Sequence, residues 1–393
     1  MNELIEQGDA VFTNNCKRYP IVFERGEGVY LYDVEGKKYL DFTSGIAVNA
    51  LGYKNESLNS ALKAQIDRFT HCSNLYWNEA GITAAQKLVE ASGLDRVFFC
   101  NSGAEANEAA FKMARKYAQK HFGEDKYEII SMKNSFHGRT IATITATGQE
   151  KYRKGFGPLL PGIVYGEFNN IENIKSLVTP KTCAILIEII QGEGGIVSID
   201  PDFLKQVRTL CDEHNIVLIM DEVQTGIGRT GAIFAYQHFG IKPDIVSIAK
   251  GIGAGIPLGA IIACDKVATG FEPGDHQATF GGNPLACTAA NVVLDALMTT
   301  DLLENVKKQG AYLATKLLAL KEKKKCIVDT RGMGLMQGIA LENCDIPLIV
   351  NKCMAAGLLL VGAGANVIRF VPPLIVNEKE IDEAISILEA CIE

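Results

Sequence analysis

The chain has 393 residues, of which 47% are hydrophobic and 22% are charged. At ~150 residues per domain, this length predicts two or three globular domains with sizeable cores. The formal net charge is −7 and no large lysine and arginine cluster occurs, which argues against a general nucleic-acid binder, since phosphate neutralisation needs a basic face. We therefore expect small molecules as partners, and no nucleic acid.

The N-terminal segment "MNELIEQGDAVF" carries acidic residues and lacks the basic start and apolar core of a signal peptide. No apolar run approaches the ~20 residues that a membrane helix requires. The eleven cysteines are scattered singly with no C-x-x-C pair, which argues against a disulfide framework and a zinc site. We expect a cytoplasmic protein with reduced thiols, no metal and no membrane partner.

Short apolar runs alternate with helix-like segments along the middle of the chain. This alternation predicts an α/β fold with a largely parallel sheet. The clearest strands cover 96–100, 127–131, 183–190, 216–220 and 244–249, and a helix is expected over 201–215. A smaller α+β unit should combine an N-terminal hairpin around Glu35-Gly36 with strands in "RGMGLMQGIAL" and "NVIRFVPPLIV" and a C-terminal helix. We expect boundaries of 1–60 for the N-terminal part of the small domain, 61–295 for the large domain and 296–393 for the C-terminal part.

Unusual residues follow several of these strands, at the sheet edge where open α/β folds bind ligands. Asn101 and Ser102 can cap a helix, and the free N–H groups of Gly103, Ala104 and their neighbours would suit a phosphate. A capped helix that binds nothing is the alternative. The capping pattern alone does not decide between the two.

Asp221 and Lys250 follow two neighbouring strands and are expected to span one strand–helix–strand unit. The acid could cap a helix, lie on the surface or hold magnesium, and the lysine could be a point charge for a phosphate or a covalent nucleophile. The chain has no G-x-x-x-x-G-K-[ST] motif, which excludes the nucleotide-triphosphatase interpretation. An acid and a lysine beside a phosphate site fit pyridoxal phosphate, which needs a lysine link, a carboxylate at its ring nitrogen and backbone donors. The glycines of "SIAKGIGAG" would let the backbone turn away close to this cofactor.

Two further strand ends add candidate residues. In "NSFHGRT", Phe136 could stack on a flat ring and Arg139 could bind a carboxylate, although a core phenylalanine and a satisfied His137 are the simpler interpretations. In "IEIIQGEGGI", Glu193 sits in a glycine-rich turn, where we expect a mobile side chain.

Seven motifs together resemble the class III pyridoxal-phosphate aminotransferases: "NSGAEANEAA", "SFHGRT", "QGEGG", "MDEVQTGIGRTG", "PDIVSIAKGIGAGIPLGA", "TFGGNPLAC" and "RFVPPL". The resemblance runs in consistent order from about residue 19 to the C-terminus. It implies a fold-type I transferase with a seven-stranded large domain, a small domain built from both termini, and an active site at a homodimer interface.

The resemblance also implies roles for individual residues around pyridoxal 5'-phosphate. Lys250 would bind the cofactor covalently, Asp221 would pair with the ring nitrogen and Gln224 with the ring hydroxyl oxygen. Phe136 and Val223 would pack on the two ring faces. The phosphate would be bound by Ser102, Gly103 and Ala104, together with the partner subunit's Thr279.

For the substrates, the resemblance implies a ping-pong ω-transamination in arginine biosynthesis, from N-acetylornithine to 2-oxoglutarate. Arg369 would take the α-carboxylate of glutamate, Glu193 would neutralise Arg369 when the other substrate binds, and Arg139 would bind the carboxylate of the acylated ornithine. Three residues near the expected substrate mouth differ from the family pattern: Cys16, Gln277 and Ala278.

Several alternatives remain at this point. The same residues would serve a class III transaminase for N-succinylornithine, N-succinyl-diaminopimelate, ornithine or 4-aminobutyrate, or an aminomutase. A non-catalytic Rossmann-like binding module would share the strand and helix pattern alone.

Overall fold

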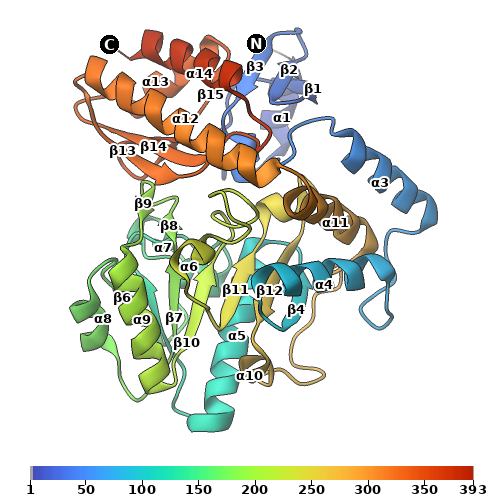
Figure 1. The fold of residues 1–393 in the computed structure, drawn as a ribbon, viewed down its shortest axis with the longest axis vertical. Coiled ribbons are helices and arrows are strands. Elements are labelled where there is room, and N and C mark those ends of the chain that lie inside the picture. Colours follow the sequence, from blue (N-terminus) through green and yellow to red (C-terminus); the bar gives the residue numbers. More distant parts are fainter. Residues whose placement is uncertain (1–2, 393) are drawn as a thin grey trace.

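A computed structural model describes residues 3–392, and its centre is a seven-stranded sheet (Figure 1). Six strands run parallel, and β12 runs antiparallel to both of its neighbours. The predicted α/β class and all five predicted strands are confirmed, whereas strands 163–166 and 259–263 were not predicted. In spatial order the strands are β4 (Arg96–Cys100), β12 (Gly259–Ala263), β11 (Ile245–Ile248), β10 (Val217–Asp221), β7 (Thr182–Glu188), β5 (Glu128–Met132) and β6 (Ile163–Gly166).

Both faces of this sheet are buried, each under its own apolar core. Successive side chains of a strand point to opposite faces and so enter the two cores alternately. In β10, Val217 and Ile219 belong to the core formed with α5 (Gly103–Phe122), whereas Leu218 and Met220 belong to the core on the other face. Helix α9 (Pro201–His214) contributes its apolar side chains to that second core and matches the predicted helix. The two cores explain why the central strands read as continuous apolar runs.

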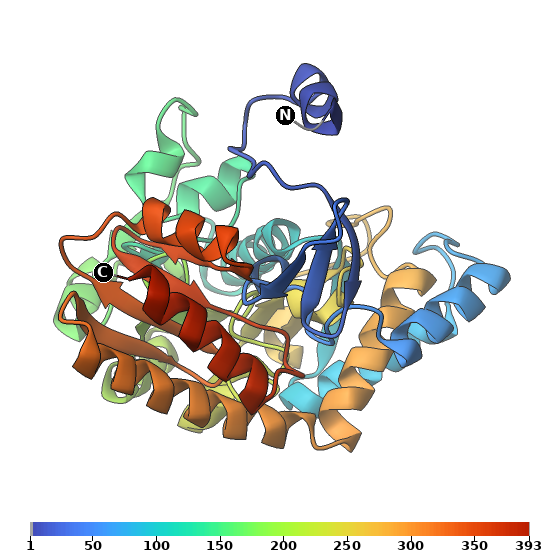
Figure 2. The ribbon, with the colours of Figure 1, turned by 90° about the horizontal axis from the view of Figure 1, so that it is seen from above.

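Two smaller sheets join the ends of the chain. One is β1 (Phe23–Glu27), β2 (Tyr30–Asp33) and β3 (Lys38–Asp41) with β15 (Leu358–Leu359), and the parallel β3–β15 pair brings the two ends together (Figure 2). The hairpin predicted around Glu35-Gly36 is therefore confirmed. The other sheet contains β13 (Ile327–Met333), β14 (Met336–Leu341), β17 (Val367–Phe370) and β16 (Val361–Ala363), covered by α12 (Leu302–Lys323) and α13 (Ile346–Ala355). Helix α14 (Glu378–Cys391) packs against α12, α13 and β15.

The remaining elements connect these units. Helix α1 (Glu3–Val11) buries none of its residues and stands off from the body of the molecule (Figure 2). The others are α2 (Ser44–Ala47), α3 (Glu56–Arg68), α4 (Glu79–Ser92), α6 (Ile141–Ala146), α7 (Glu150–Arg153), α8 (Ile171–Leu177), β8 (Ile190–Gln191), β9 (Val197–Ser198), η1 (Ala235–Phe239), η2 (Lys250–Gly253), α10 (Asp265–Ala268) and α11 (Pro284–Thr299).

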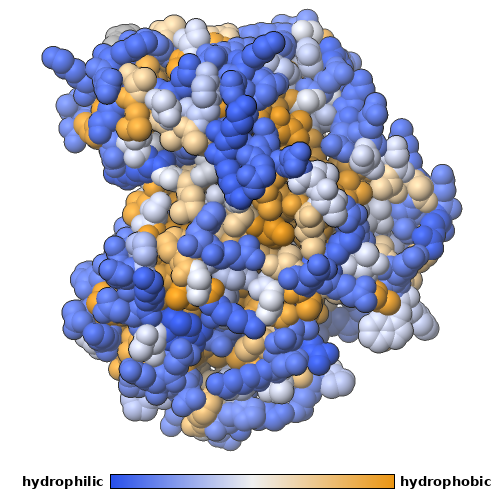
Figure 3. All heavy atoms as spheres, in the orientation of Figure 1, coloured by the Kyte–Doolittle hydropathy of each residue, from blue (hydrophilic) through white to orange (hydrophobic). Residues whose placement is uncertain are grey.

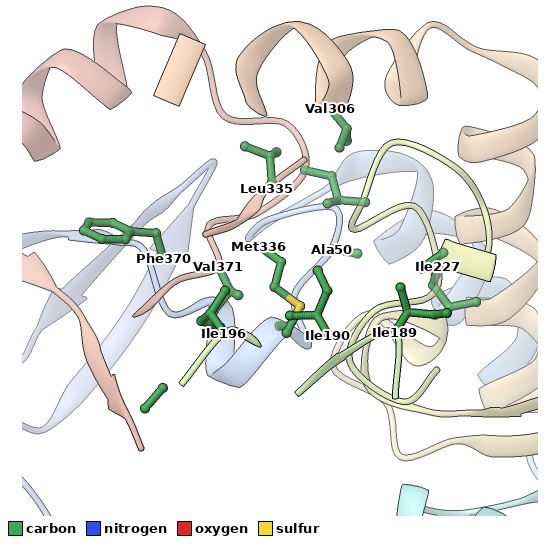
Figure 4. Close-up of a cluster of buried hydrophobic side chains, with 14 of the residues drawn as sticks. Ala50, Ile189, Ile190, Ile196, Ile227, Val306, Leu335, Met336, Phe370 and Val371 are labelled. Carbon is green, nitrogen blue, oxygen red and sulfur yellow. The ribbon is translucent and has the colours of Figure 1, made fainter. Parts of the chain in front are cut away.

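One continuous apolar core extends from the large sheet into the C-terminal sheet. Figure 4 shows Ile189, Ile190 and Ile227 on one side of it and Leu335 and Met336 on the other. Apolar side chains are also gathered in the middle of the face seen in Figure 3, below α12, with hydrophilic side chains around them. The shared core fixes the C-terminal sheet against the strand ends that carry the candidate residues.

Among residues 3–392, no single helix is both long and apolar enough to cross a membrane. Only helices α11 and α12 taken together are long and apolar enough, and the pair is bent by 73° at the break between them.

Candidate active site

A cavity of about 360 Å³ lies where the ends of β7, β10 and β11 meet the start of α5. The structure brings nine of the predicted site residues to its wall: Ser102, Gly103, Ala104, Phe136, Glu193, Asp221, Val223, Gln224 and Lys250. The wall also contains polar residues that were not predicted as site residues, among them Asn107, His137 and Glu188.

The start of α5 forms one end of the cavity. Ser102 caps the helix by accepting a hydrogen bond from the Glu105 N–H, as predicted. The first N–H groups of a helix have no intrahelical acceptor, so those of Gly103 and Ala104 are available to an anion in the cavity. A Cβ atom at Gly103 would lie 2.7 Å from Val223, so only glycine lets the helix start approach this wall.

Asp221 is 5% exposed and is held by three donors. Its Oδ2 accepts from Asn107 Nδ2 at 2.8 Å and lies 2.7 Å from His137 Nδ1, and its Oδ1 accepts from the Val223 N–H at 3.0 Å. Asn107 is itself fixed by Ser247, whose hydroxyl donates to Asn107 Oδ1 at 2.7 Å. This network keeps an ionised carboxylate in a defined position inside the protein.

The sequence holds signals for two members of this network. Asn107 is the polar residue on the otherwise alanine-rich buried face of α5. His137 has a hydrogen-bond partner at Nδ1, as its simpler interpretation predicted, but that partner is Asp221 in the cavity. Its buried Nε2 has no partner among the described residues. Each residue therefore supports the site, and each stands in one of the quoted motifs, although neither was predicted as a site residue.

Lys250 begins η2, immediately after β11, and its side chain lines the cavity. Burial, and secondarily the charge of Arg369, lower the pKa of its ammonium to about 8. Its φ of +50° lies in the left-handed region, which non-glycine residues rarely adopt and which is often found at functional sites. A lysine with this pKa supplies a neutral amine, and hence a nucleophile, near neutral pH.

The structure differs from two local predictions around Lys250. Lys250 and Ala254 themselves adopt the left-handed backbone, whereas Gly251 and Gly253 do not and have ordinary room for a Cβ atom. Of the three glycines in this segment, only Gly255, on the cavity wall, turns with a positive φ, of +107°. The chain from Asp221 to Lys250 is also not a strand–helix–strand unit, because its helical part is only the five-residue η1. The glycine-rich "GIGRTG" and its positive φ angles at Ile227 and Gly228 prevent a regular helix there.

Arg369, on β17, reaches this site from the C-terminal sheet. It is 1% exposed, and its Nη1 lies 2.6 Å from Glu193 Oε1 and donates to Gln224 Oε1 at 2.9 Å. The Glu193 side chain retains 22% of its exposure. A buried arginine is thus neutralised by a glutamate. The arginine is fixed on a strand, whereas the glutamate stands on a glycine-rich turn that restrains its position less.

Glu188 ends β7 and stands beside Asp221 in the parallel pairing of β7 and β10. It is 7% exposed, and its one hydrogen bond among residues 3–392 is from the Phe136 N–H, at 3.3 Å. Burial and the neighbouring charge of Asp221 raise its pKa well above the usual range.

The other predicted cofactor and substrate residues lie outside the cavity wall. Arg139 is exposed, with its guanidinium 4.2 Å above the Tyr152 ring. Thr279 is exposed, and Ala278 is tied by its carbonyl to Asn74 Nδ2 at 2.7 Å. Gln277 and Cys16 are exposed, and Cys16 lies in the N-terminal segment that follows α1.

The family of the chain follows from comparison with known proteins. A model of the family described as aminotransferase class III matches residues 11–392. The chain belongs to the class III aminotransferases. The expected family is confirmed, and the alternative of a non-catalytic binding module is wrong.

Curated relatives are similar to the chain over nearly its whole length. A protein named acetylornithine aminotransferase from Caldanaerobacter subterraneus is 52% identical over 95% of this chain and 94% of its own length. One with the same name from Methanocaldococcus jannaschii is 49% identical over 95% of this chain and 93% of its own length.

Solved structures of two kinds share the fold. The N-acetylornithine aminotransferase from Stenotrophomonas maltophilia is 35% identical with a TM-score of 0.85, over 98% of each chain. The ornithine aminotransferase from Toxoplasma gondii is 31% identical with a TM-score of 0.95, over 99% of this chain and 94% of its own.

As a class III aminotransferase, the chain uses pyridoxal phosphate, and its cavity fits that cofactor. The wall offers an anion site at the α5 start, a lysine amine with a lowered pKa, and an ionised acid fixed by three donors. These are the groups that hold the phosphate, the reactive carbon and the ring nitrogen of this cofactor.

Proposed function

We propose that this aminotransferase moves the terminal amino group of N-acetylornithine to 2-oxoglutarate, as in arginine biosynthesis. The observation that supports this most is the buried ion pair of Arg369 and Glu193, because such a pair would let one cavity accept two chemically different amino donors. The names of the curated relatives, at 49–52% identity over most of the chain, support the same choice.

We propose the following roles for the cavity residues. When bound, pyridoxal phosphate supplies an electron sink for the carbanion formed at the substrate carbon. Asp221 would keep the ring nitrogen protonated, and Gln224 would donate to the ring hydroxyl oxygen. Lys250 would hold the cofactor and would carry the proton between carbon atoms as a general acid and base.

The remaining cofactor contacts are packing and phosphate contacts. Phe136 and Val223 would cover the two ring faces. The phosphate would be bound by Ser102, Gly103 and Ala104, and by the partner subunit's Thr279.

The two substrates differ at the reacting amine. Glutamate carries a carboxylate beside that amine, and Arg369 would bind it once Glu193 moves away. The terminal amine of acetylornithine has no adjacent carboxylate, so Glu193 would stay in place, because a bare buried charge costs ~3–5 kcal/mol. Arg139, with Cys16, Gln277 and Ala278 at the mouth, would then contact the far carboxylate and the acyl group.

Free ornithine is a second candidate substrate, supported by the TM-score of 0.95 to the Toxoplasma gondii ornithine aminotransferase. N-succinylornithine, N-succinyl-diaminopimelate and 4-aminobutyrate also carry a terminal amine. A half-reaction test separates them: each amine is mixed with the cofactor-loaded enzyme, and loss of the lysine-bound cofactor's visible absorbance is followed. We expect N-acetylornithine to react at the lowest concentration, and no reaction with it would overturn the assignment.

Adding 2-oxoglutarate to the same mixture tests amino transfer itself. Glutamate should form and the visible absorbance should return. An aminomutase would give no glutamate.

We propose that the enzyme is a cytoplasmic homodimer. An exposed apolar surface supports this: Trp77 is 90% exposed, and Leu75, Tyr76 and Phe280 are exposed beside it. The Asn74–Ala278 hydrogen bond joins the two loops of this surface, next to Thr279. Light scattering should give twice the chain mass, and Trp77→Ser with Phe280→Ser should give a monomer. Phe156→Ser, at another exposed apolar residue, is the control and should leave the mass unchanged.

We also propose the division into domains at 1–60, 61–295 and 296–393. The β3–β15 pair supports joining the first and last parts into one small domain. Helix α11, which spans residue 295, would be the link between the small and large domains.

A further inference from the structure

Two carboxyl groups stand next to each other in the cavity wall, on neighbouring strands. Asp221 and Glu188 are paired in the parallel register of β10 and β7, and registered residues of paired strands point to the same face. Both are more than nine-tenths buried. Two adjacent buried carboxylates cannot both be ionised without a large electrostatic cost, so one of them keeps its proton.

The hydrogen bonds decide which one. Asp221 has three partners within 3.0 Å, and each of them can donate to an ionised carboxylate. Glu188 has one weak donor, the Phe136 N–H at 3.3 Å, and no ion pair among residues 3–392. The ionised form is therefore stabilised much more strongly at Asp221 than at Glu188.

The charged groups around Glu188 do not reverse this result. Glu193, on the β8–β9 turn, and Asp221 oppose its ionisation, whereas Lys250 favours it. The cation of Arg369 is already paired with Glu193, and His137 is already bonded to Asp221.

We propose that Glu188 is a neutral positioning residue of the cofactor site, which stays protonated beside the ionised Asp221 and holds the backbone of Phe136. Its neutrality leaves Asp221 as the one carboxylate at the ring nitrogen. Its hydrogen bond fixes the start of the segment that carries both Phe136, at the cavity, and His137, the partner of Asp221. The inference depends on the cofactor of the family and not on which amine is the substrate.

Infrared spectroscopy of protein with isotope-labelled glutamate tests the proton directly, on the cofactor-loaded enzyme at about pH 8. Glu188→Gln should remove one carbonyl band of a protonated carboxyl group. Glu222→Gln is the matched control: that buried acid accepts three hydrogen bonds and has a pKa of about 7, so at this pH its change should remove a carboxylate band. Loss of a carboxylate band in Glu188→Gln would overturn the proposal.

The visible absorbance of the lysine-bound cofactor gives a second readout. Its pH midpoint should move by less than about 0.3 units in Glu188→Gln, because no charge is removed, whereas removing a nearby negative charge would lower it by ~1 unit or more. Glu188→Ala should release the cofactor at least several-fold faster than Glu188→Gln, because only glutamine keeps an acceptor for the Phe136 N–H. Equal release rates would refute the positioning role.

If Glu188→Gln does not fold, the infrared spectrum of the labelled wild-type enzyme still tests whether a glutamate is protonated. A protonated glutamate band that persists at about pH 8 supports the proposal, and its absence overturns it.

Discussion

Arg369 and Glu193 join two parts of the fold through one buried ion pair, with 2.6 Å between Nη1 and Oε1. Arg369 comes from the C-terminal sheet and Glu193 from the turn between β8 and β9 of the large unit. The arginine is fixed on a strand and also donates to Gln224, whereas the glutamate has glycine neighbours on both sides. The pair can therefore open by movement of the glutamate alone.

Replacing Glu193 by Gln should separate the two half-reactions. The reaction with N-acetylornithine should slow by ~10²–10³-fold in kcat/KM, because Arg369 is then left uncompensated when no carboxylate is bound beside it. The reaction with glutamate should change by less than about tenfold, since its own carboxylate neutralises Arg369. Single-turnover absorbance measurements with each substrate check this.

The control for this variant is Glu167→Gln, which removes an exposed partner of Lys133, and neither residue is part of the cavity wall. Surface pairs of this kind contribute little, so both half-reactions should match the wild type. Equal losses in the two half-reactions of Glu193→Gln would contradict the switching role.

The sequence predicted the sheet and the parts of the site that lie at strand ends. Asp221 and Lys250 could be placed together because parallel strands deliver their carboxyl ends to one edge. The β7–β10 register that sets Glu188 beside Asp221 could not be predicted, because it depends on strand pairing rather than on any motif. The Asn107 contact could not be predicted either, since it depends on how α5 lies across the sheet.

The lowered pKa of Lys250 predicts how the protein without cofactor captures pyridoxal phosphate. With a pKa of about 8, roughly one lysine in ten is a neutral amine at about pH 7, against fewer than one in a thousand at the usual value of 10.5. The rate of cofactor capture should thus rise with pH, and half of the rise should be reached near pH 8. Stopped-flow absorbance measures it, and a midpoint near 10 would contradict the burial of the amine.

The charge of Arg369 adds to the effect of burial on Lys250. Arg369→Met should therefore raise the capture midpoint, by a few tenths of a unit to ~1 unit. Lys133→Met is the control, because this lysine is exposed and lies outside the cavity wall, and it should leave the midpoint unchanged.

Asn107→Leu should weaken cofactor binding by ~10–100-fold. The substitution keeps a similar volume but removes the amide that donates to Asp221 Oδ2, and hydrogen bonds to charged groups contribute ~1.5–3 kcal/mol. Equilibrium titration of the protein with pyridoxal phosphate measures the change. Ser247→Ala, which removes only the group that orients Asn107, should have a smaller effect in the same direction.

Glu222 gives a prediction about stability rather than binding. Burial raises its pKa from 4.5 to about 7, although it accepts from Thr225, Ala235 and Tyr236. Between these values the folded protein keeps a proton that the unfolded chain releases, so this group lowers the free energy of unfolding as pH rises from about 4.5 to about 7, by up to about 3 kcal/mol. Above pH 7 its contribution is constant.

Denaturant unfolding of Glu222→Gln against the wild type, across this pH range, isolates the contribution. The variant should be less stable at every pH, because an amide cannot accept all three hydrogen bonds, but the difference should be largest near pH 4.5 and should shrink toward pH 7. A difference that grows with pH would mean that Glu222 is ionised throughout. In that case its three donors, and not its burial, would determine the charge of the acid next to Asp221.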